Sequence, residues 1–289
     1  MPSIRMPLPG DPEDAPIDEA CRALRLPAFR ERFVDLAAIA RREQSTYKQF
    51  LLLDLPQVEV ADRDIRRQQR LVRSAKFPRP KRLEDFAFEK NPNVSPEVIA
   101  DLKAPSWVRE GRPLVLIGDS GTGKSHLLIG VGTAIAEAGL TVRYITTSAL
   151  VNELAEADAG RRLSSVIARQ SKVNLLCLDE FGYLNLDKKG AKPLFQIFTE
   201  REERKATAVA TNSPLAEWGK IFNEPRLCAA IADRITFRCT LIRTGTESYA
   251  SRRPKPGVRR TPGDQAASGG GSSSRTARVH QMPFAAVAQ

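Results

Sequence analysis

A glycine-rich turn at residues 118–125, GDSGTGKS, constrains the fold of this chain more than any other feature. The apolar run PLVLI precedes the turn, and the helix-like stretch HLLIGVGTAIAEAG follows it. Gly118, Gly123, Lys124 and Ser125 match the pattern G-x-x-x-x-G-K-[ST]. Glycines at such a turn let backbone N–H groups point inward without Cβ clashes. We therefore expect a phosphate-binding loop between a strand and the N-terminus of a helix.

The loop predicts that a nucleoside triphosphate, ATP, binds at this turn with Mg²⁺. Lys124 is placed to reach the β- and γ-phosphates, and the Ser125 hydroxyl to ligate Mg²⁺. His126 follows on the helix, and packing is favoured for it over catalysis because the sequence places no second ligand near it. The predicted cofactor-binding residues are Gly118, Asp119, Ser120, Gly121, Thr122, Gly123, Lys124, Ser125 and His126.

Two further apolar runs end in polar residues that suit phosphate chemistry. VNLLCLDE ends in Asp179 and Glu180. Asp179 is expected to hold Mg²⁺ through water, and Glu180 to polarise an attacking water. This pair favours hydrolysis, because a nucleotide kinase needs no base for water. ATAVATN ends in Asn212, which is expected to touch the γ-phosphate or to position water, with a turn-forming role as the alternative.

Short apolar runs alternate with helical stretches from Leu114 onward. This alternation predicts an α/β fold, in which helices flank a parallel sheet, preceded by a small helical domain. The predicted domains are a disordered lead-in (1–20), a helical basic domain (21–90), a P-loop ATPase domain (91–251) and a disordered tail (252–289), which is rich in Gly, Ser and Pro.

The helical domain is expected to contain three helices. Apolar residues recur at three- and four-residue steps from Phe29 to Ala40, so they share one face of a first predicted helix. Ser45 is expected to cap a second helix, which Pro56 kinks or ends. The third helix is predicted over residues 58–75.

Positive charge is concentrated on this third helix and just beyond it. The chain has 45 Lys and Arg against 34 Asp and Glu, a net charge of +11. Between residues 63 and 82 only Asp64 opposes the basic residues. Side chains at three- and four-residue steps share a helix face, and a face of one sign favours phosphate contact over a merely solvated surface. The expected contacts with duplex DNA are Arg63, Arg66, Arg67, Arg70, Arg73 and Lys76.

Composition argues against several classes of protein. The four cysteines have no C-x-x-C spacing and there are two histidines, which argues against a zinc site or a disulfide framework. No apolar stretch approaches the ~20 residues of a membrane span. The opening residues MPSIRMPLPGDPEDAP lack the apolar core of a secretory signal. We therefore expect a cytoplasmic protein that has no membrane contact.

Taken together, residues 24–252 resemble the IstB-like transposition helpers, which are AAA+ ATPases related to the DnaC-type helicase loaders. DEFGYL and NSPLAEWGKIF are the most distinctive segments. The resemblance also rests on LRLPAFRERF, YKQFLL, AKFPRPKRLEDFAF, GDSGTGKSHL, LDEFGYLNLDKKGAKPLFQIF, TNSPLAEWGKIF, AIADRI and ESYASR.

The resemblance implies a role for each site residue. Lys124 and Ser125 would form the Walker A motif, Asp179 and Glu180 the Walker B pair, and Asn212 sensor 1. Arg234, in AIADRI, would reach the nucleotide of a neighbouring subunit, so that hydrolysis depends on assembly. The alternative for Arg234 is an exposed helix arginine. The resemblance further implies an ATP-state homo-oligomer on duplex DNA that recruits or stimulates a transposase encoded elsewhere.

The sequence departs from the family at Asp119, where a non-acidic residue is usual, at Pro56, and in the tail. Asp119 places an extra negative charge beside the phosphate site, which would weaken ATP affinity. Three alternative functions remain open. A replicative helicase loader would favour stacking aromatics for single strands, and Phe77 is the sole aromatic of the basic run. The others are a small-molecule phosphotransferase and a nucleotide-gated scaffold with little hydrolysis.

Overall fold

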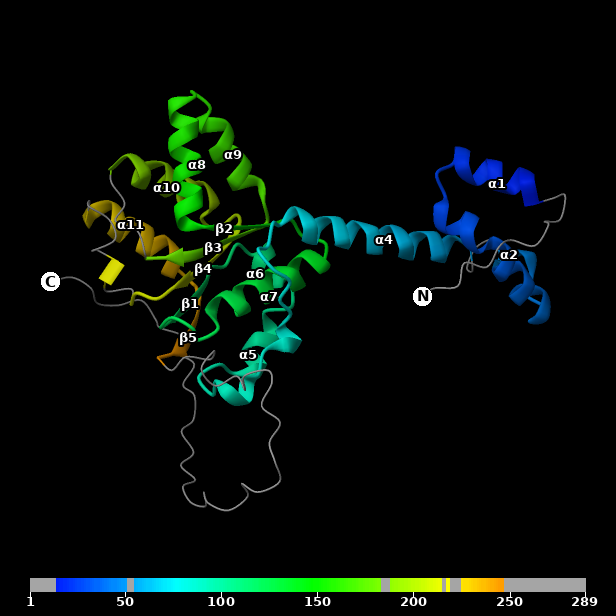
Figure 1. Ribbon diagram of the computed structural model, residues 1–289, viewed down its shortest axis with the longest axis horizontal. Coiled ribbons are helices and arrows are strands. Elements are labelled where there is room, and N and C mark those ends of the chain that lie inside the picture. The colour runs from blue at the N-terminus through cyan, green and yellow to red at the C-terminus, as the bar shows by residue number, and fades with distance from the viewer. Residues whose placement is uncertain (1–13, 51–54, 183–187, 215–216, 219–224, 247–289) are drawn as a thin grey trace, which may run out of the picture. The chain divides into compact units, whose positions relative to one another are not determined.

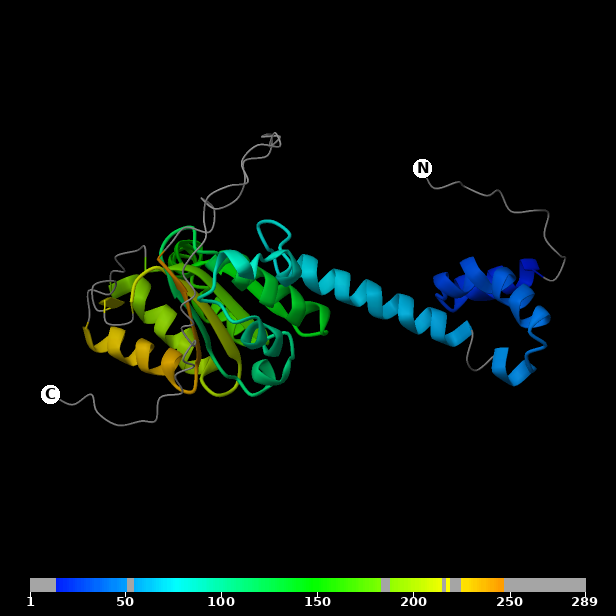
Figure 2. The same cartoon turned by 90° about the horizontal axis from the view of Figure 1, so that it is seen from below.

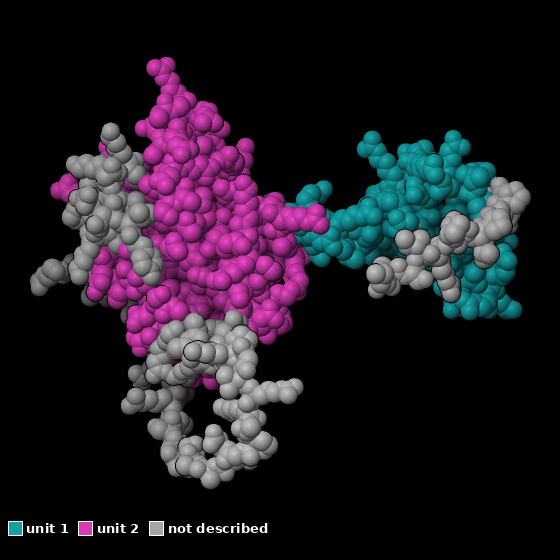
Figure 3. Space-filling model, in the orientation of Figure 1, with its two compact units in different colours: residues 1–70 teal, residues 71–289 magenta. Residues whose placement is uncertain are grey.

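A computed structural model describes residues 14–50, 55–182, 188–214, 217–218 and 225–246. The chain divides into two compact units, residues 1–70 and 71–289, which Figure 3 shows in different colours. The predicted tail at 252–289 and the first part of the predicted lead-in lie outside the described residues.

The first unit is helical. It contains α1 (Asp14–Ala23), α2 (Pro27–Arg42), α3 (Tyr47–Gln49) and most of α4 (Leu55–Ser74). Disorder was predicted up to residue 20, but α1 begins at Asp14. Asp14 stabilises the positive end of the helix dipole, and Cys21 is buried on the inner face, so this helix gains both a favourable N-terminus and a packed side.

A buried carboxylate fastens α2 to α4. Glu59 is 4% exposed. Its Oε2 accepts hydrogen bonds from the backbone N–H groups of Ala28 at 3.0 Å and Phe29 at 3.2 Å. These N–H groups belong to the first turn of α2, where helix donors lack intrahelical partners. Glu59 therefore caps α2 from another helix.

The helix boundaries differ slightly from those predicted. Thr46, not Ser45, caps α3, because its Oγ1 accepts from the Gln49 N–H at 3.2 Å. Pro56 lies in the first turn of α4, a position where proline costs no helical hydrogen bond. The long basic helix predicted over 58–75 is confirmed as α4, with its start three residues earlier.

The second unit is built on a five-stranded parallel sheet, which confirms the predicted α/β fold class (Figures 1 and 2). The strands are β1 (Leu114–Gly118), β2 (Val142–Thr146), β3 (Leu175–Phe181), β4 (Ala206–Thr211) and β5 (Thr240–Gly245). Their order is β2-β3-β4-β1-β5. Every residue of β4 is buried, as expected for a central strand with both faces covered.

Helices cover both faces of the sheet (Figure 1). On one face lie α8 (Thr147–Ala159), α9 (Leu163–Lys172), α10 (Lys188–Arg201) and α11 (Pro225–Thr236). On the other lie α7 (Lys124–Glu137) and the short elements before β1, namely η2 (Leu83–Asp85), η3 (Phe88–Lys90), α5 (Pro96–Asp101) and α6 (Ser106–Arg109).

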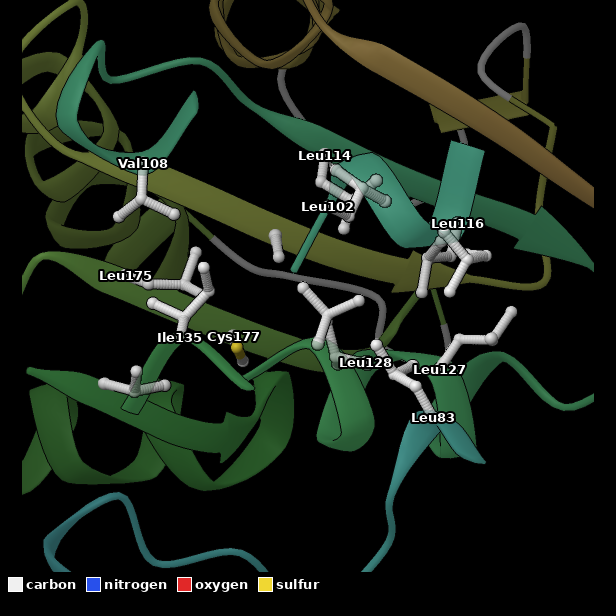
Figure 4. Packing of buried hydrophobic residues seen from close by; sticks show 14 of the residues in the cluster. Leu83, Leu102, Val108, Leu114, Leu116, Leu127, Leu128, Ile135, Leu175 and Cys177 are labelled. Atoms are coloured by element: carbon white, nitrogen blue, oxygen red, sulfur yellow. The ribbon is translucent and has the colours of Figure 1, made fainter. Parts of the chain in front are cut away.

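The alternation of side chains along β1 separates the two cores. Leu114 and Leu116 pack toward α7, whereas Val115 packs toward the opposite helices. In Figure 4, Leu127 and Leu128 of α7 point toward these strands, with Leu83 beside them. This packing fixes the first turns of α7, which directly follow the glycine-rich turn.

Residues 71–90 pack with the second unit. Ala75, Leu83 and Phe86 are at most 3% exposed and belong to the core on the α7 face. The boundary between the units therefore falls at residues 70 and 71 rather than at residue 90. The Ala75 carbonyl oxygen also accepts a hydrogen bond from the Tyr144 N–H of β2 at 2.8 Å.

Candidate nucleotide-binding site

A cleft of about 380 Å³ opens at the carboxyl ends of the parallel strands, the edge where α/β sheets bind ligands. It is formed by the glycine-rich turn, the first turns of α7, the ends of β3 and β4, and two residues of the segment after α4. The lining residues are Arg79, Lys81, Ser120, Gly121, Gly123, Lys124, Ser125, His126, Ile129, Asp179, Glu180, Ala210 and Asn212.

Close packing fixes the conformation of the turn. Gly121 and Gly123 have φ of 79° and 96°, in the left-handed region that favours glycine. A Cβ on Gly118 would lie 2.2 Å from Thr244 Oγ1, and one on Gly123 would lie 2.7 Å from Phe86 Cε2. The turn therefore requires glycine at Gly118 for space, and at Gly123 for both space and backbone conformation.

Thr122 and Asn91 tie the turn to β5. Thr122 is fully buried, and its Oγ1 lies 2.6 Å from Thr244 Oγ1. Asn91 Nδ2 donates to the carbonyl oxygens of Thr122 and Thr244, both at 3.0 Å. Three of the predicted cofactor-binding residues, Gly118, Asp119 and Thr122, thus support the turn and do not line the cleft, whereas the other six line it.

Lys124 begins α7 and lines the cleft. Its Nζ donates to the Asp119 carbonyl oxygen at 2.6 Å, which holds the ammonium against the turn. Burial lowers the pKa of Lys124, while the negative charges of Asp179 and Asp119 oppose that shift. The exposed Asp119 carboxylate thus acts on this site through its charge.

The acidic pair at the end of β3 has two different environments. Asp179 is 4% exposed, and its Oδ1 accepts from the Glu180 N–H at 2.8 Å. Glu180 is exposed and has φ of 57°, which is uncommon for a residue with a side chain. Such a conformation costs free energy, and strained residues of this kind cluster at functional sites. The structure thus separates a fixed carboxylate from one that projects into the cleft.

Tyr144 of β2 is a site residue that sequence reasoning missed. Its hydroxyl donates to Asp179 Oδ2 at 2.6 Å. Burial and this hydrogen bond to a carboxylate raise the pKa of Tyr144, so the hydroxyl remains a donor at neutral pH. The register of the sheet brings it there: Thr146 pairs with Asp179, so Tyr144 lies on the neighbouring strand two residues before that position.

Asn212 and His126 both line the cleft. Asn212 directly follows β4, and its Oδ1 lies 3.3 Å from the position that a Cβ on Gly182 would take. His126 is 8% exposed, its Nε2 lies 2.8 Å from the Arg82 carbonyl oxygen, and its ring meets Phe86 edge-on at 5.5 Å. His126 thereby joins α7 to the segment that precedes η2, in line with a packing role.

Arg234 lies away from this cleft. It is near the C-terminus of α11, and it lines a separate cavity of about 260 Å³ with residues such as Pro113 and Thr207, which lie at the amino ends of β1 and β4. Its Nε is 3.0 Å from Glu202 Oε2, and its guanidinium carbon is 4.7 Å from the Phe195 ring centroid. Arg234 therefore cannot serve the nucleotide of its own chain in this arrangement.

The predicted DNA-contacting residues fall into two groups. Arg63 pairs with Glu59 at 2.9 Å, and Arg66 with Asp62 at 2.8 Å. Both carboxylates precede residue 63, outside the basic run of residues 63–82, so the unopposed positive charge of α4 is smaller than the sequence predicts. The other four are exposed and have no ion pair with any residue that the structure describes: Arg67, Arg70, Arg73 and Lys76.

The donor set of the cleft suits Mg²⁺ carried by a nucleotide. Ser125 and Asp179 both line the cleft, which gives one hydroxyl and one carboxylate. Mg²⁺ is commonly bound through one or two carboxylates together with substrate phosphates. Within the described residues, no group of three or more His, Cys, Asp or Glu could hold a metal by itself. No helix in that part of the chain has the length and apolar character to cross a membrane.

Comparison with known proteins places the chain among proteins of insertion sequences. An insertion-sequence ATP-binding protein of Sinorhizobium fredii is 35% identical over 230 residues, covering 79% of this chain and 77% of that protein. The ATP-binding protein of insertion sequence IS5376 from Geobacillus stearothermophilus is 31% identical over 236 residues, covering 82% and 94%.

Among solved structures, AMPPCP-bound DnaA from Aquifex aeolicus aligns with a TM-score of 0.49 and 21% identity, over 58% of this chain and 51% of that one. The family described as IstB-like ATP binding protein matches residues 19–256, which contain every site residue described above. The chain therefore belongs to the family of IstB-like ATP-binding proteins of insertion sequences.

Proposed function

We propose that this chain is an ATPase that assists transposition: it binds ATP with Mg²⁺, assembles on duplex DNA as a homo-oligomer, and recruits or stimulates a transposase encoded elsewhere. The observation that carries the ATPase assignment is a single cleft that combines Lys124 and Ser125 with Asp179 and Glu180. The insertion-sequence origin of the relatives supports the transposition context.

The proposed binding step follows from the start of α7. The first N–H groups of a helix lack intrahelical partners and carry partial positive charge, so they attract phosphate oxygens. Lys124 would move from the Asp119 carbonyl oxygen to the β- and γ-phosphates. Ser125 and Asp179 would hold Mg²⁺, which neutralises charge that develops on the phosphates.

The proposed hydrolysis step uses the exposed carboxylate. Glu180 would accept a proton from the attacking water, while the carboxamide of Asn212 orients that water or the γ-phosphate. Asp179, fixed by Tyr144 and the Glu180 N–H, stays in place as Glu180 acts. Arg234 is proposed to act on the nucleotide of another subunit, because it lies at the amino ends of the strands of its own sheet, away from the cleft at their carboxyl ends.

The proposed DNA contact relies on the cations of α4 that carry no ion pair among the described residues. Arg67, Arg70 and Arg73 recur at helical spacing on one face. Such a row contacts phosphates without reading bases, so the affinity is expected to depend strongly on salt and weakly on sequence.

Two substitutions test the ATPase assignment. We expect Lys124→Ala to abolish ATP binding, and Glu180→Gln to bind ATP yet hydrolyse it at least 100-fold more slowly, because a general base contributes about 10²–10⁴-fold. Isothermal titration and phosphate release measure the two effects. Lys172→Ala and Glu156→Gln, which change exposed residues of α9 and α8, are the matched controls.

The outcome also separates the alternatives. Unchanged turnover in Glu180→Gln would contradict its role as base and favour the nucleotide-gated scaffold.

Fluorescence anisotropy with labelled duplex and single-stranded DNA, each with a non-hydrolysable ATP analogue or ADP, tests the DNA step. Duplex binding that requires the ATP analogue is expected. A preference for single strands would favour the helicase loader, and an absence of DNA binding in both states would favour the phosphotransferase or the scaffold.

A further inference from the structure

The cleft contains two cations that lie outside the glycine-rich turn and the acidic pair. Arg79 and Lys81 come from the segment between α4 and η2, and both line the cleft beside Lys124, Asp179 and Glu180. Arg79 is exposed and Lys81 is half-buried. Neither has an ion-pair partner among the described residues, so both charges are available to a ligand.

The segment is anchored at both ends on the ATPase core. Before Arg79, the Ala75 carbonyl oxygen accepts from the Tyr144 N–H at 2.8 Å, and the Phe77 ring packs 6.0 Å from that of Tyr144. After Lys81, the Arg82 carbonyl oxygen lies 2.8 Å from His126 Nε2. The two cations are therefore held over the cleft between fixed points.

Sequence makes the intervening chain stiff. Prolines flank Arg79 as Pro78 and Pro80. Each proline fixes its own φ and restricts the preceding residue to extended conformations. A stiff segment loses little conformational freedom when its side chains bind, so more of the interaction free energy goes into affinity.

Charge balance gives these cations a role. Without them, the lining has one cation, Lys124, facing two carboxylates, Asp179 and Glu180. The side-chain charges of such a lining sum to a negative value, which opposes the binding of a polyphosphate. Arg79 and Lys81 reverse the sign, so that the lining carries one net positive charge.

The position of the segment selects which phosphate they meet. Its anchor at Tyr144 lies on β2, next to β3 with Asp179 and Glu180. The opposite side of the turn, at β5, is already occupied by Asn91 and Thr244. Arg79 and Lys81 therefore face the side of the cleft that carries the proposed metal ligand and base.

We propose that Arg79 and Lys81 bind the terminal phosphate of a nucleoside triphosphate bound to the same chain, so that the segment leading out of α4 distinguishes ATP from ADP. This inference rests on the proposed ATP binding. It adds phosphate ligands supplied by the same chain to those of the glycine-rich turn. It also places the terminal phosphate in contact with the segment that directly continues the arginine-bearing helix.

The test is equilibrium binding of ATP and ADP, each with Mg²⁺, to full-length Arg79→Ala and Lys81→Ala. Each variant is expected to bind ATP about tenfold more weakly, the loss of one charge-assisted hydrogen bond, and ADP within about twofold of wild type. Arg82→Ala is the matched control, since Arg82 belongs to the same segment but pairs with Glu137 and does not line the cleft. Lys81→Arg, which keeps the positive charge, should bind ATP more tightly than Lys81→Ala does and with an ATP-to-ADP affinity ratio close to that of wild type.

The outcomes separate this inference from the proposed function. If wild type binds ATP, Lys124→Ala does not, and both segment variants bind ATP like wild type, the inference is wrong and the proposed function stands. If wild type binds no nucleotide, the proposed function fails first. Equal losses for ATP and ADP, or a comparable loss in Arg82→Ala, would overturn the assignment to the terminal phosphate. Unchanged thermal unfolding without nucleotide excludes misfolding as the cause.

Discussion

Single side chains from neighbouring strands decide how the acidic pair is presented. The Tyr144 hydroxyl donates to Asp179, and Asp179 accepts in turn from the Glu180 N–H. A partner of this kind orients a metal-binding carboxylate, and its removal typically weakens metal affinity 10–100-fold. Tyr144 is thus a positioning residue for the proposed Mg²⁺ site.

We expect Tyr144→Phe to raise the Mg²⁺ concentration needed for half-maximal ATP hydrolysis by about tenfold, with less effect on the maximal rate. Because the pKa of Tyr144 is raised by burial and by Asp179, its hydroxyl stays protonated and the difference from wild type should be constant between about pH 6 and 9. A Mg²⁺ titration of phosphate release measures this. An unchanged Mg²⁺ requirement would refute the positioning role.

Arg201 is a buried side chain that stabilises the fold by donating hydrogen bonds to backbone carbonyl oxygens. It is 1% exposed, and its guanidinium donates to Thr207 Oγ1 and to the carbonyl oxygens of Gln170, Val173, Asn174 and Ala206. Burial lowers the pKa of Arg201 to about 9, which still leaves it charged at neutral pH. It joins the end of α9 to the starts of β3 and β4.

We expect Arg201→Met to lower the free energy of unfolding by about 3–5 kcal/mol, because several buried carbonyl oxygens lose their donor. Arg201→Lys should recover little of this loss, since one ammonium cannot reach acceptors spread around a planar fork. Arg204→Met, at an exposed position nearby, is the control for urea unfolding. A decrease of less than about 1 kcal/mol in the free energy of unfolding of Arg201→Met would show that these hydrogen bonds contribute little to stability.

At the scale of elements, two glycines in α7 leave space for the segment after α4 to pack closely against this helix. A Cβ on Gly130 would lie 2.7 Å from Leu83 Cδ2 and 3.2 Å from the Leu83 backbone nitrogen. A Cβ on Gly132 would lie 3.0 Å from the Phe77 ring. Glycine in a helix costs about 1 kcal/mol relative to alanine, so close packing is what these glycines provide.

Gly130→Ala is therefore expected to lower the free energy of unfolding by about 1–2 kcal/mol despite its better helix propensity. In a Leu83→Ala background, where the space is free, the same substitution should be neutral or stabilising. Thermal unfolding of the four proteins of this double-mutant cycle gives the coupling free energy. Equal effects in both backgrounds would show that Leu83 is not the obstacle.

Local patterns predicted one part of the site, and tertiary contacts created the rest. The loop residues, Asp179, Glu180 and Asn212 end apolar strands, so spacing alone brings them to one edge of a parallel sheet. Tyr144 and Arg79 reach that edge through strand register and the path of a connecting segment, which periodicity does not encode. Glu59 of α4 reaches the first turn of α2, a contact between two helices that the spacing of charges along the chain does not encode.

For the whole molecule, net charge is a poor guide to DNA contact without the ion pairs. Arg67 and Arg70 have no ion pair among the described residues, whereas Arg66 pairs with Asp62. We expect Arg67→Ala and Arg70→Ala each to reduce the slope of log affinity against log salt by about 0.9, and Arg66→Ala to reduce it less. Anisotropy titrations on duplex DNA at several salt concentrations measure these slopes, and equal reductions in all three would contradict the distinction.

The hydrogen bond from the Tyr144 N–H to the Ala75 carbonyl oxygen has one more consequence, for aggregation. Strand β2 lies at an edge of the sheet, where free amides invite pairing with another chain. The amide at its middle residue is already occupied. The opposite edge strand, β5, carries the exposed charge of Arg243, another common protection. A chain guarded at both edges can meet other copies of itself through side chains without its sheets joining into fibres.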